Sequence, residues 1–254
     1  MRSPRTMAKI LVINPNSNEA VTEAIREAAA PLALHGGPQI ECRTLTTGPF
    51  GIESQADTDA VVMPTRAIVA ERTDVDAFVL ACYSDPGLEV CREATRAAVL
   101  GIRECSVFAA LSLADRFGVV ALGPASVKRQ ARAFRQMGVT DRWVGSAPLY
   151  MSVAQSHEPK AFPDIVEAAE ELLDDGAEAV ILGCAGMVHH RAPLEDKLGV
   201  PVIDPVQAAT IQALGQALLA DAASKLPKPV TQISDARGWS ERARRRELSR
   251  RRPH

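Results

Sequence analysis

Asp76-Ala-Phe-Val-Leu-Ala-Cys82 and Glu178-Ala-Val-Ile-Leu-Gly-Cys184 are two copies of one pattern, and this pattern decides the fold class. Each copy has an acidic residue, an alanine, three apolar residues, a small residue and a cysteine, and the two cysteines lie 102 residues apart. Short apolar runs of this kind are typical of buried strands, so each cysteine is predicted to end a strand. The spacing indicates a duplicated unit.

The same duplication is visible at the start of each half. Lys9 to Ile13 is an apolar run before Asn14-Pro-Asn-Ser17, and Phe117 to Leu122 is a similar run before Gly123-Pro-Ala-Ser126. Both are signals of a strand followed by a turn.

A helix is predicted after each of these turns. Alanine-rich, charged stretches run from Glu19 to Ala30 and from Val127 to Met137. Ser17 and Ser126 are predicted as their N-caps, because a serine hydroxyl can accept from the first free backbone N–H groups.

Two further pairs of segments match in the same order. Thr47-Gly-Pro49 resembles Ser146-Ala-Pro148, and Cys105-Ser-Val-Phe-Ala109 corresponds to Val200-Pro-Val-Ile-Asp204, which predicts a strand in each half. Each half then reads strand, helix, strand, helix, strand with cysteine, helix, strand. This order predicts an α/β fold in which each half is a mostly parallel sheet flanked by helices.

The predicted architecture is two pseudo-symmetric lobes with the active site in the cleft between them. Residues 8–107 with 208–224 form the lobe that carries Cys82, and residues 108–207 form the lobe that carries Cys184. A last helix, from about Pro205 to Ser224, is expected to begin at the N-cap Asp204 and to pack back on the first lobe.

Composition narrows the class of protein. The chain of 254 residues has 46% hydrophobic residues, enough for a packed core, and no apolar run approaches the ~20 residues of a membrane span. Because Lys9 closely follows a polar N-terminal segment, no signal-like region is expected. The five cysteines show neither disulfide nor metal spacing, so a cytoplasmic protein with reduced thiols and no metal site is predicted.

The C-terminal segment has a different charge from the rest. Residues 225–254 contain ten Lys or Arg and three Asp or Glu, although the whole chain has a net charge of −2. This basic tail follows a proline-spaced linker and has no aromatic residue except Trp239. We therefore expect a disordered extension rather than a nucleic-acid partner.

The surroundings of the two cysteines suggest proton transfer. Asp85-Pro86 after Cys82 is predicted to cap and begin a helix, and Ala185-Gly186 after Cys184 again turns a strand into a helix. Backbone N–H groups at a helix start are expected to lower a thiol pKa and to bind an oxyanion. Two opposed thiols could then remove a proton from one face of a carbon and return one to the other face, without a cofactor.

Four motifs together resemble the hydantoin/allantoin racemase family of the Asp/Glu racemase superfamily. They are Ile13-Asn-Pro-Asn-Ser17, Thr47-Gly-Pro49 with Ile52-Glu-Ser54, Ala81-Cys-Tyr-Ser-Asp-Pro-Gly-Leu88 and Leu182-Gly-Cys-Ala-Gly-Met187, and the similarity covers roughly residues 8 to 224. It implies an isomerase that racemises C5 of a 5-substituted hydantoin or allantoin, with Cys82 and Cys184 as its acid/base pair. It also implies a small cyclic ureide as substrate and a homo-oligomer.

The candidate substrate-binding residues lie in these motifs and in the turn after the strand at Phe117 to Leu122. They are Asn14, Ser17, Thr47, Gly48, Pro49, Tyr83, Ser84, Gly123, Ala185 and Gly186. Asn14 and Ser17 can equally be turn and cap residues.

The chain departs from the family pattern beside the first thiol. The family usually has Phe-Gly where this chain has Tyr83-Ser84, and His189-His190 after the second motif are unusual and are expected on a surface helix. Three alternatives stay open: a maleate isomerase-like enzyme, a decarboxylase-like enzyme, and a non-catalytic small-molecule-binding protein. Nucleotide-binding glycine motifs and a GxSxG elbow are absent from the sequence.

Overall fold

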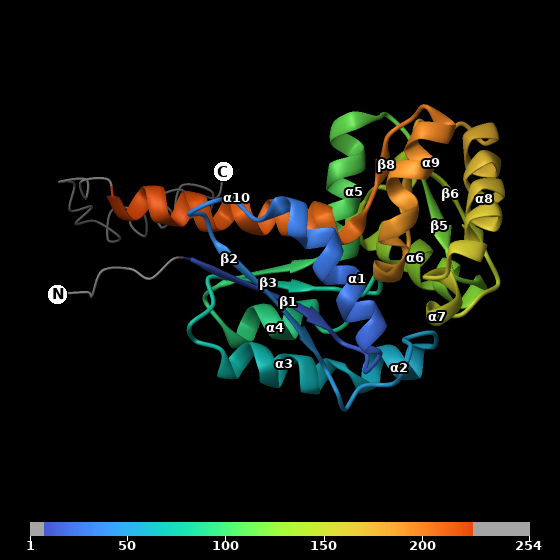
Figure 1. The fold of residues 1–254 in the computed structure, drawn as a ribbon. Helices are drawn as coiled ribbons and strands as arrows, with labels where there is room; N and C mark the ends of the chain where they lie inside the picture. Colours follow the sequence, from blue (N-terminus) through green and yellow to red (C-terminus); the bar gives the residue numbers. More distant parts are fainter. Residues whose placement is uncertain (1–7, 226–254) are drawn as a thin grey trace, which may run out of the picture. The chain divides into compact units, whose positions relative to one another are not determined.

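Two four-stranded parallel sheets form the framework of the protein (Figure 1). The structure is a computed structural model that describes residues 8–225. The first sheet has the order β2-β1-β3-β4 and the second the order β6-β5-β7-β8, so the predicted duplicated, parallel α/β architecture is confirmed. The strands are β1 (Lys9–Asn14), β2 (Gln39–Thr44), β3 (Ala77–Leu80), β4 (Ala98–Gly101), β5 (Phe117–Ala121), β6 (Trp143–Pro148), β7 (Ala179–Leu182) and β8 (Val202–Ile203).

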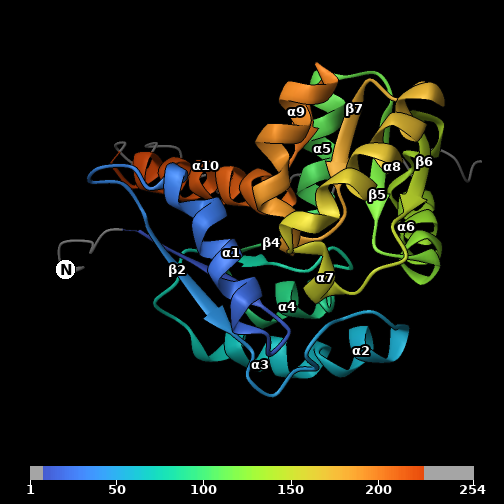
Figure 2. The same ribbon diagram turned by 45° about the vertical axis from the view of Figure 1, so that its right-hand side comes forward.

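Helices cover both faces of each sheet (Figures 1 and 2). The first half contains α1 (Glu19–Ala29), α2 (Gln55–Ala60), α3 (Val62–Glu71), α4 (Leu88–Ala94) and α5 (Ile102–Leu113). The second half contains α6 (Pro124–Met137), α7 (Val153–Ser156), α8 (Phe162–Asp174), the 3-10 helix η4 (Ala185–His190), α9 (Arg191–Leu198) and α10 (Pro205–Lys225). Shorter 3-10 turns are η1 (Ala30–Leu32), η2 (Thr140–Arg142) and η3 (Pro159–Ala161).

Alternating side chains of β1 belong to two different cores. In β1, Ile10 and Val12 pack with Val21 and Ile25 of α1, whereas Leu11 and Ile13 belong to the core that includes residues of α3 and α4. Such strands are apolar on both faces because helices bury both, which explains the continuous apolar runs in the sequence.

One predicted strand is wrong. Cys105–Ala109 lies inside helix α5, and the strand of this half is β4, Ala98–Gly101. The strand register shows that β4 is the equivalent of β8. Phe78 of β3 pairs with Val99 of β4, as Val180 of β7 pairs with Val202 of β8. Periodicity alone cannot separate a short apolar strand from a segment of buried helix.

Three predicted helix caps are also wrong. Asn18, not Ser17, caps α1 by accepting from the N–H of Ala20. Helix α6 begins at Pro124, so Ser126 lies in its first turn rather than before it. The N-cap of α4 is Gly87, whose φ of 71° suits glycine, and Asp85 has a different role, described below.

The last helix begins where the sequence predicts. Asp204 accepts from the N–H of Gln207 at 2.7 Å, and Pro205 is the first helical residue. The side chain of Gln207 donates to the carbonyl of Ala28 in α1, and that of Gln212 donates to the carbonyl of Cys105 in α5. Through these two bonds α10 packs on α1 and α5 of the first half.

The unit that contains both sheets ends at Asp221. The predicted basic tail lies outside the described residues except for Lys225. Within the part of the chain that the structure describes, none of the helices has the length and apolar character needed to cross a membrane.

Candidate active site

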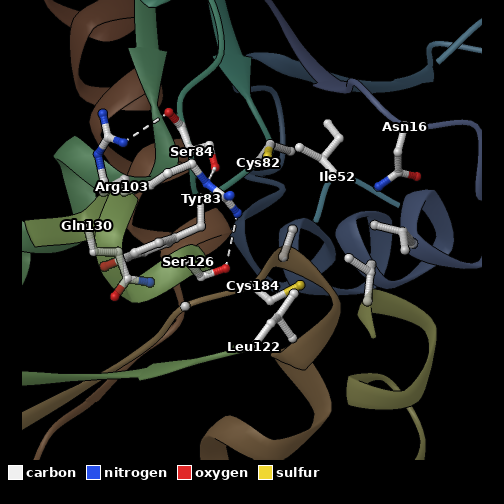
Figure 3. A pocket seen from close by; sticks show the side chains of 16 residues that line it. Asn16, Ile52, Cys82, Tyr83, Ser84, Arg103, Leu122, Ser126, Gln130 and Cys184 are labelled. Atoms are coloured by element: carbon white, nitrogen blue, oxygen red, sulfur yellow. Dashed lines mark hydrogen bonds between the residues drawn. The ribbon is translucent and has the colours of Figure 1, made fainter. Parts of the chain in front are cut away.

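Cys82 and Cys184 face one pocket between the two sheets. Each follows the end of a central strand by two residues, Cys82 after β3 and Cys184 after β7. Both line the same cavity, whose volume is about 40 Å³. Figure 3 shows the two sulfur atoms on opposite sides of the open space. The duplicated sequence pattern thus places one thiol from each half at a single site.

Burial dominates the electrostatics of both thiols. It raises the pKa of Cys82 to about 12, against the opposing effects of the Ser84 backbone N–H and of the positive charge of Arg129. It also raises the pKa of Cys184, against the N–H of Gly186 and the hydroxyl of Ser156, which lies 3.9 Å from the sulfur. The expectation of lowered pKa values is therefore wrong, because desolvation of each thiolate outweighs the one backbone N–H group beside it.

Asn16 presents a hydrogen-bond donor to the pocket. Its side-chain oxygen accepts from the side chain of Asn14 at 3.0 Å and from the backbone N–H of Asn18 at 2.9 Å. With the oxygen occupied, the amide NH₂ is the group left for a ligand, and Asn16 lines the cavity. The predicted residue Asn14 lies behind it, fully buried, and holds it in place.

Three of the predicted binding residues line the pocket. Tyr83 and Ser84 follow Cys82, and Ala185 follows Cys184. The hydroxyl of Ser84 accepts from Nε of Arg129 at 3.3 Å, whereas Tyr83 is buried in the core that also contains Val107. The residues that depart from the family pattern are therefore part of the pocket wall.

Six other predicted residues are not among those that line the cavity: Ser17, Thr47, Gly48, Pro49, Gly123 and Gly186. The carbonyl of Pro49 accepts from the N–H of Ser17, and a Cβ on Gly48 would lie 2.4 Å from the carbonyl oxygen of Pro15. These residues shape the turn that carries Asn16, and Gly186 acts on Cys184 through its backbone.

Several lining residues carry no signal in the sequence. Arg129 and Gln130 belong to the amphipathic helix α6, Ile52 lies in the loop between β2 and α2, and Val153 is the first residue of α7. The remaining residues of the wall are Val21, Ala81, Arg103, Leu122, Ser126 and Gly183. A charged residue in an amphipathic helix is ordinarily exposed to solvent. Arg129 is recognised as a pocket residue only from the structure, in which α6 of the second half lies against the first half.

Asp85 fixes the loop that carries Cys82. Its carboxylate accepts from the N–H groups of Arg103 and Glu104, both at 3.0 Å, at the start of α5. It also faces Nε of Arg103 at 3.6 Å. In the second half the corresponding helix start, that of α10, is capped by Asp204, which directly follows β8. The strand pairings place Gly101 of the first half at the position equivalent to Asp204.

The histidines beside Cys184 differ from the surface pair expected. His189 is exposed and faces Glu27 at 3.3 Å, but His190 is buried, with Nε2 3.1 Å from the carbonyl oxygen of Ser156. Because Ser156 also neighbours the sulfur of Cys184, His190 supports this side of the pocket.

The polar groups of the wall are mainly donors. They include the Asn16 amide and the guanidinium groups of Arg103 and Arg129, and no carboxylate belongs to the wall in the described part of the chain. Such a wall suits a ligand rich in carbonyl oxygens, with a thiol on either side of it. A two-lobed α/β protein with one cysteine from each lobe at a shared pocket has the arrangement that proton transfer to both faces of a carbon requires, as in a racemase.

The chain belongs to the Asp/Glu/Hydantoin racemase family, whose sequence model matches residues 10–213. It is 38% identical to a hydantoin racemase of Paenarthrobacter aurescens over 207 residues, 79% of this chain and 87% of that protein. Allantoin racemase from Klebsiella pneumoniae is similar in structure, with a TM-score of 0.80, 29% identity and coverage of 84% and 89% of the two chains. Allantoin racemase from Pseudomonas fluorescens has a TM-score of 0.78 and 26% identity, over 89% and 99%.

Proposed function

We propose that this protein inverts C5 of a 5-substituted hydantoin or of allantoin, with Cys82 and Cys184 as the two proton carriers. The observation that carries the proposal is that the two thiols, matched in the duplicated fold, line the same small pocket. Relatives named hydantoin racemase and allantoin racemase support a cyclic ureide as substrate.

The proposed reaction is a proton transfer across the ring. One cysteine, as thiolate, takes the C5 proton, and the electron pair of the broken C–H bond moves onto the adjacent carbonyl as an enolate. The other cysteine, as thiol, gives its proton to the opposite face of C5. The two sulfurs exchange protonation states in each turnover, so the same site accepts both enantiomers.

The wall of the pocket supports a ureide rather than a free amino acid. An amino acid brings an ammonium group, and burying that group without a carboxylate is costly. Ring carbonyls instead match the donors of Asn16 and the backbone.

The test is exchange in D₂O. Enantiopure 5-methylhydantoin, 5-benzylhydantoin and allantoin are incubated with the protein, and optical rotation and C5 deuteration are followed. Loss of rotation together with deuteration of at least one substrate is expected. If every ureide kept both its rotation and its C5–H bond, the proposal would fail.

Single cysteine variants test the two-thiol step. Cys82→Ser and Cys184→Ser should each abolish racemisation, while each leaves exchange of the C5 proton in one enantiomer, because one thiol still faces one side of the ring. Cys42→Ser is the matched control, since Cys42 is a partly buried thiol of β2 and is not among the wall residues. Full racemisation by either single pocket variant would contradict the scheme.

We propose in addition that the protein is a cytoplasmic homo-oligomer. All five cysteines are free thiols in the structure, which supports a reducing compartment. Light scattering coupled to size-exclusion chromatography tests the assembly, and a mass of one chain, 27.2 kDa, would contradict it.

A further inference from the structure

Arg129 is a buried cation held by neutral oxygens. It lies in α6 with 9% of its surface exposed. Nε donates to the hydroxyl of Ser84 at 3.3 Å, one terminal nitrogen to the carbonyl of Glu53 at 3.2 Å, and the other to the hydroxyl of Ser126 at 3.2 Å. These three contacts hold the guanidinium at the pocket from both halves of the fold.

No carboxylate pairs with Arg129 within 4.0 Å among residues 8–225, in contrast with the other arginine of the wall. Arg103 faces the carboxylate of Asp85 at 3.6 Å. Over longer distances the charges of Asp57 and Arg132 act on the pKa of Arg129 in opposite directions. The positive charge of Arg129 is therefore the one in the pocket that no close carboxylate neutralises.

Two donors of Arg129 remain for a ligand. A guanidinium has five N–H groups, and three of them are used in the contacts above. A buried cation with spare donors strongly favours an anion beside it, because water no longer solvates its charge. Its charge already acts on the sulfur of Cys82.

The charge of the reacting molecule changes during the proposed reaction. A hydantoin is neutral when it binds, and it becomes an enolate when its C5 proton leaves. A fixed cation thus interacts more strongly with the enolate than with the substrate, which is the condition for lowering the barrier.

We infer that Arg129 is a catalytic residue that donates to the enolate oxygen formed beside Cys82, and that Ser84 positions it. The inference rests on the proposed function and names a group that acts in it besides the thiols. Ser84 replaces the glycine of the family pattern, and its hydroxyl is what Nε of Arg129 contacts.

Binding of a stable anion tests the charge without catalysis. Urazole is hydantoin with C5 replaced by an ionisable N–H, so its anion places negative charge where the enolate forms, and hydantoin itself is the neutral control. Calorimetry should show that the unmodified protein binds urazole at least 10-fold more tightly than hydantoin at pH 8. Arg129→Gln should remove most of this preference and leave hydantoin affinity within about threefold. Equal affinity of the unmodified protein for the two ligands would overturn the inference.

Steady-state kinetics of the variants distinguishes loss of the positive charge from a general loss of structure. Arg129→Gln should lower kcat by about 100-fold with little change in KM, as removal of one oxyanion donor does in other enzymes. Arg129→Lys, which keeps the charge, should retain more activity than Arg129→Gln. Ser84→Gly should lower kcat by less than 10-fold, because the cation remains. Arg132→Gln is the matched control, one turn along α6 on an exposed side chain.

The outcomes distinguish two failures. If the unmodified protein racemises ureides and Arg129→Gln does so with an unchanged kcat, the role of Arg129 is wrong and the proposed function stands. If the unmodified protein racemises no ureide, the proposed function fails and the role of Arg129 falls with it. If Arg129→Gln does not fold, the urazole and hydantoin affinities of the unmodified protein and the Arg129→Lys variant decide.

Discussion

Replacing Gly101 by alanine should displace the loop that carries Cys82. Gly101 has φ of −92° and ψ of 138°, which alanine adopts without strain, so only space is at issue. A Cβ there would lie 2.3 Å from Cγ of Asp85 and 2.5 Å from its Oδ2. Relief of this overlap needs a shift of about 1 Å in a carboxylate that is held by two backbone N–H groups.

The cost follows from what the carboxylate does. Loss of a capping carboxylate costs about 0.5–2 kcal/mol, and a buried charge that loses its partner costs about 3–5 kcal/mol. Because the loop can relax in part, we expect Gly101→Ala to lower the free energy of unfolding by about 3 kcal/mol. A shift of about 1 Å at Cys82 should also lower kcat by about 100-fold.

Urea unfolding and the rate of racemisation measure the two effects. Gly145→Ala is the control, since its Cβ would meet only Cδ2 of Leu172, at 3.9 Å, and should change stability by less than about 0.5 kcal/mol. In an Asp85→Ala background the Gly101→Ala change should cost less than about 1 kcal/mol, a coupling of about 2 kcal/mol. A Gly101→Ala protein with the stability and kcat of the unmodified protein would refute this account of the loop.

Two further predictions concern ionisation. Burial raises the pKa of Cys82 to about 12, so the fraction of thiolate should keep increasing with pH. The rate at which iodoacetamide alkylates Cys82 in the protein without ligand, measured by mass spectrometry, should therefore increase up to at least pH 10. A rate that reaches a plateau below pH 8 would contradict this. Burial also raises the pKa of Asp204 from 3.8 to about 6, so the ionised form is disfavoured in the folded state, and the contribution of Asp204 to stability falls as the pH rises from about 4 to 6. Asn caps a helix as well as Asp does, so Asp204→Asn should be more stable than the unmodified protein at pH 7.5, by up to about 3 kcal/mol, and should lose this advantage at pH 4. An equal difference in stability at both pH values in thermal unfolding would show that Asp204 does not titrate in this way.

The predictable part of the fold depended on local pattern. The strands before Cys82 and Cys184 are apolar at every position because helices cover both faces of each sheet, and this makes them recognisable from the sequence. The same property misplaced one strand, since Cys105–Ala109 is also largely apolar and belongs to α5. Register between neighbouring strands, which the sequence does not state, corrected the match.

The site was predictable only where chemistry and strand ends coincide. The thiols, with Tyr83, Ser84 and Ala185 next to them, follow the ends of strands and line the pocket. The prediction of Asn14 as a binding residue identified the turn that borders the pocket. Within this turn the hydrogen bonds of Asn16 hold its side chain so that Asn16, not Asn14, lines the pocket. Arg129 comes from a helix of the other half, and no local pattern marks it.

The sequence by itself determined the duplicated parallel fold and the positions of Cys82 and Cys184 after equivalent strands, because periodicity and strand ends are properties of neighbouring residues. The tertiary structure alone decided which groups surround these thiols and how readily the thiols ionise. Burial opposes the Cys82 thiolate more than the Ser84 N–H and the charge of Arg129 favour it, so the pKa of Cys82 lies above its usual range rather than below. Desolvation and the approach of Arg129 to Cys82 depend on how the two halves face each other, which no stretch of sequence encodes locally.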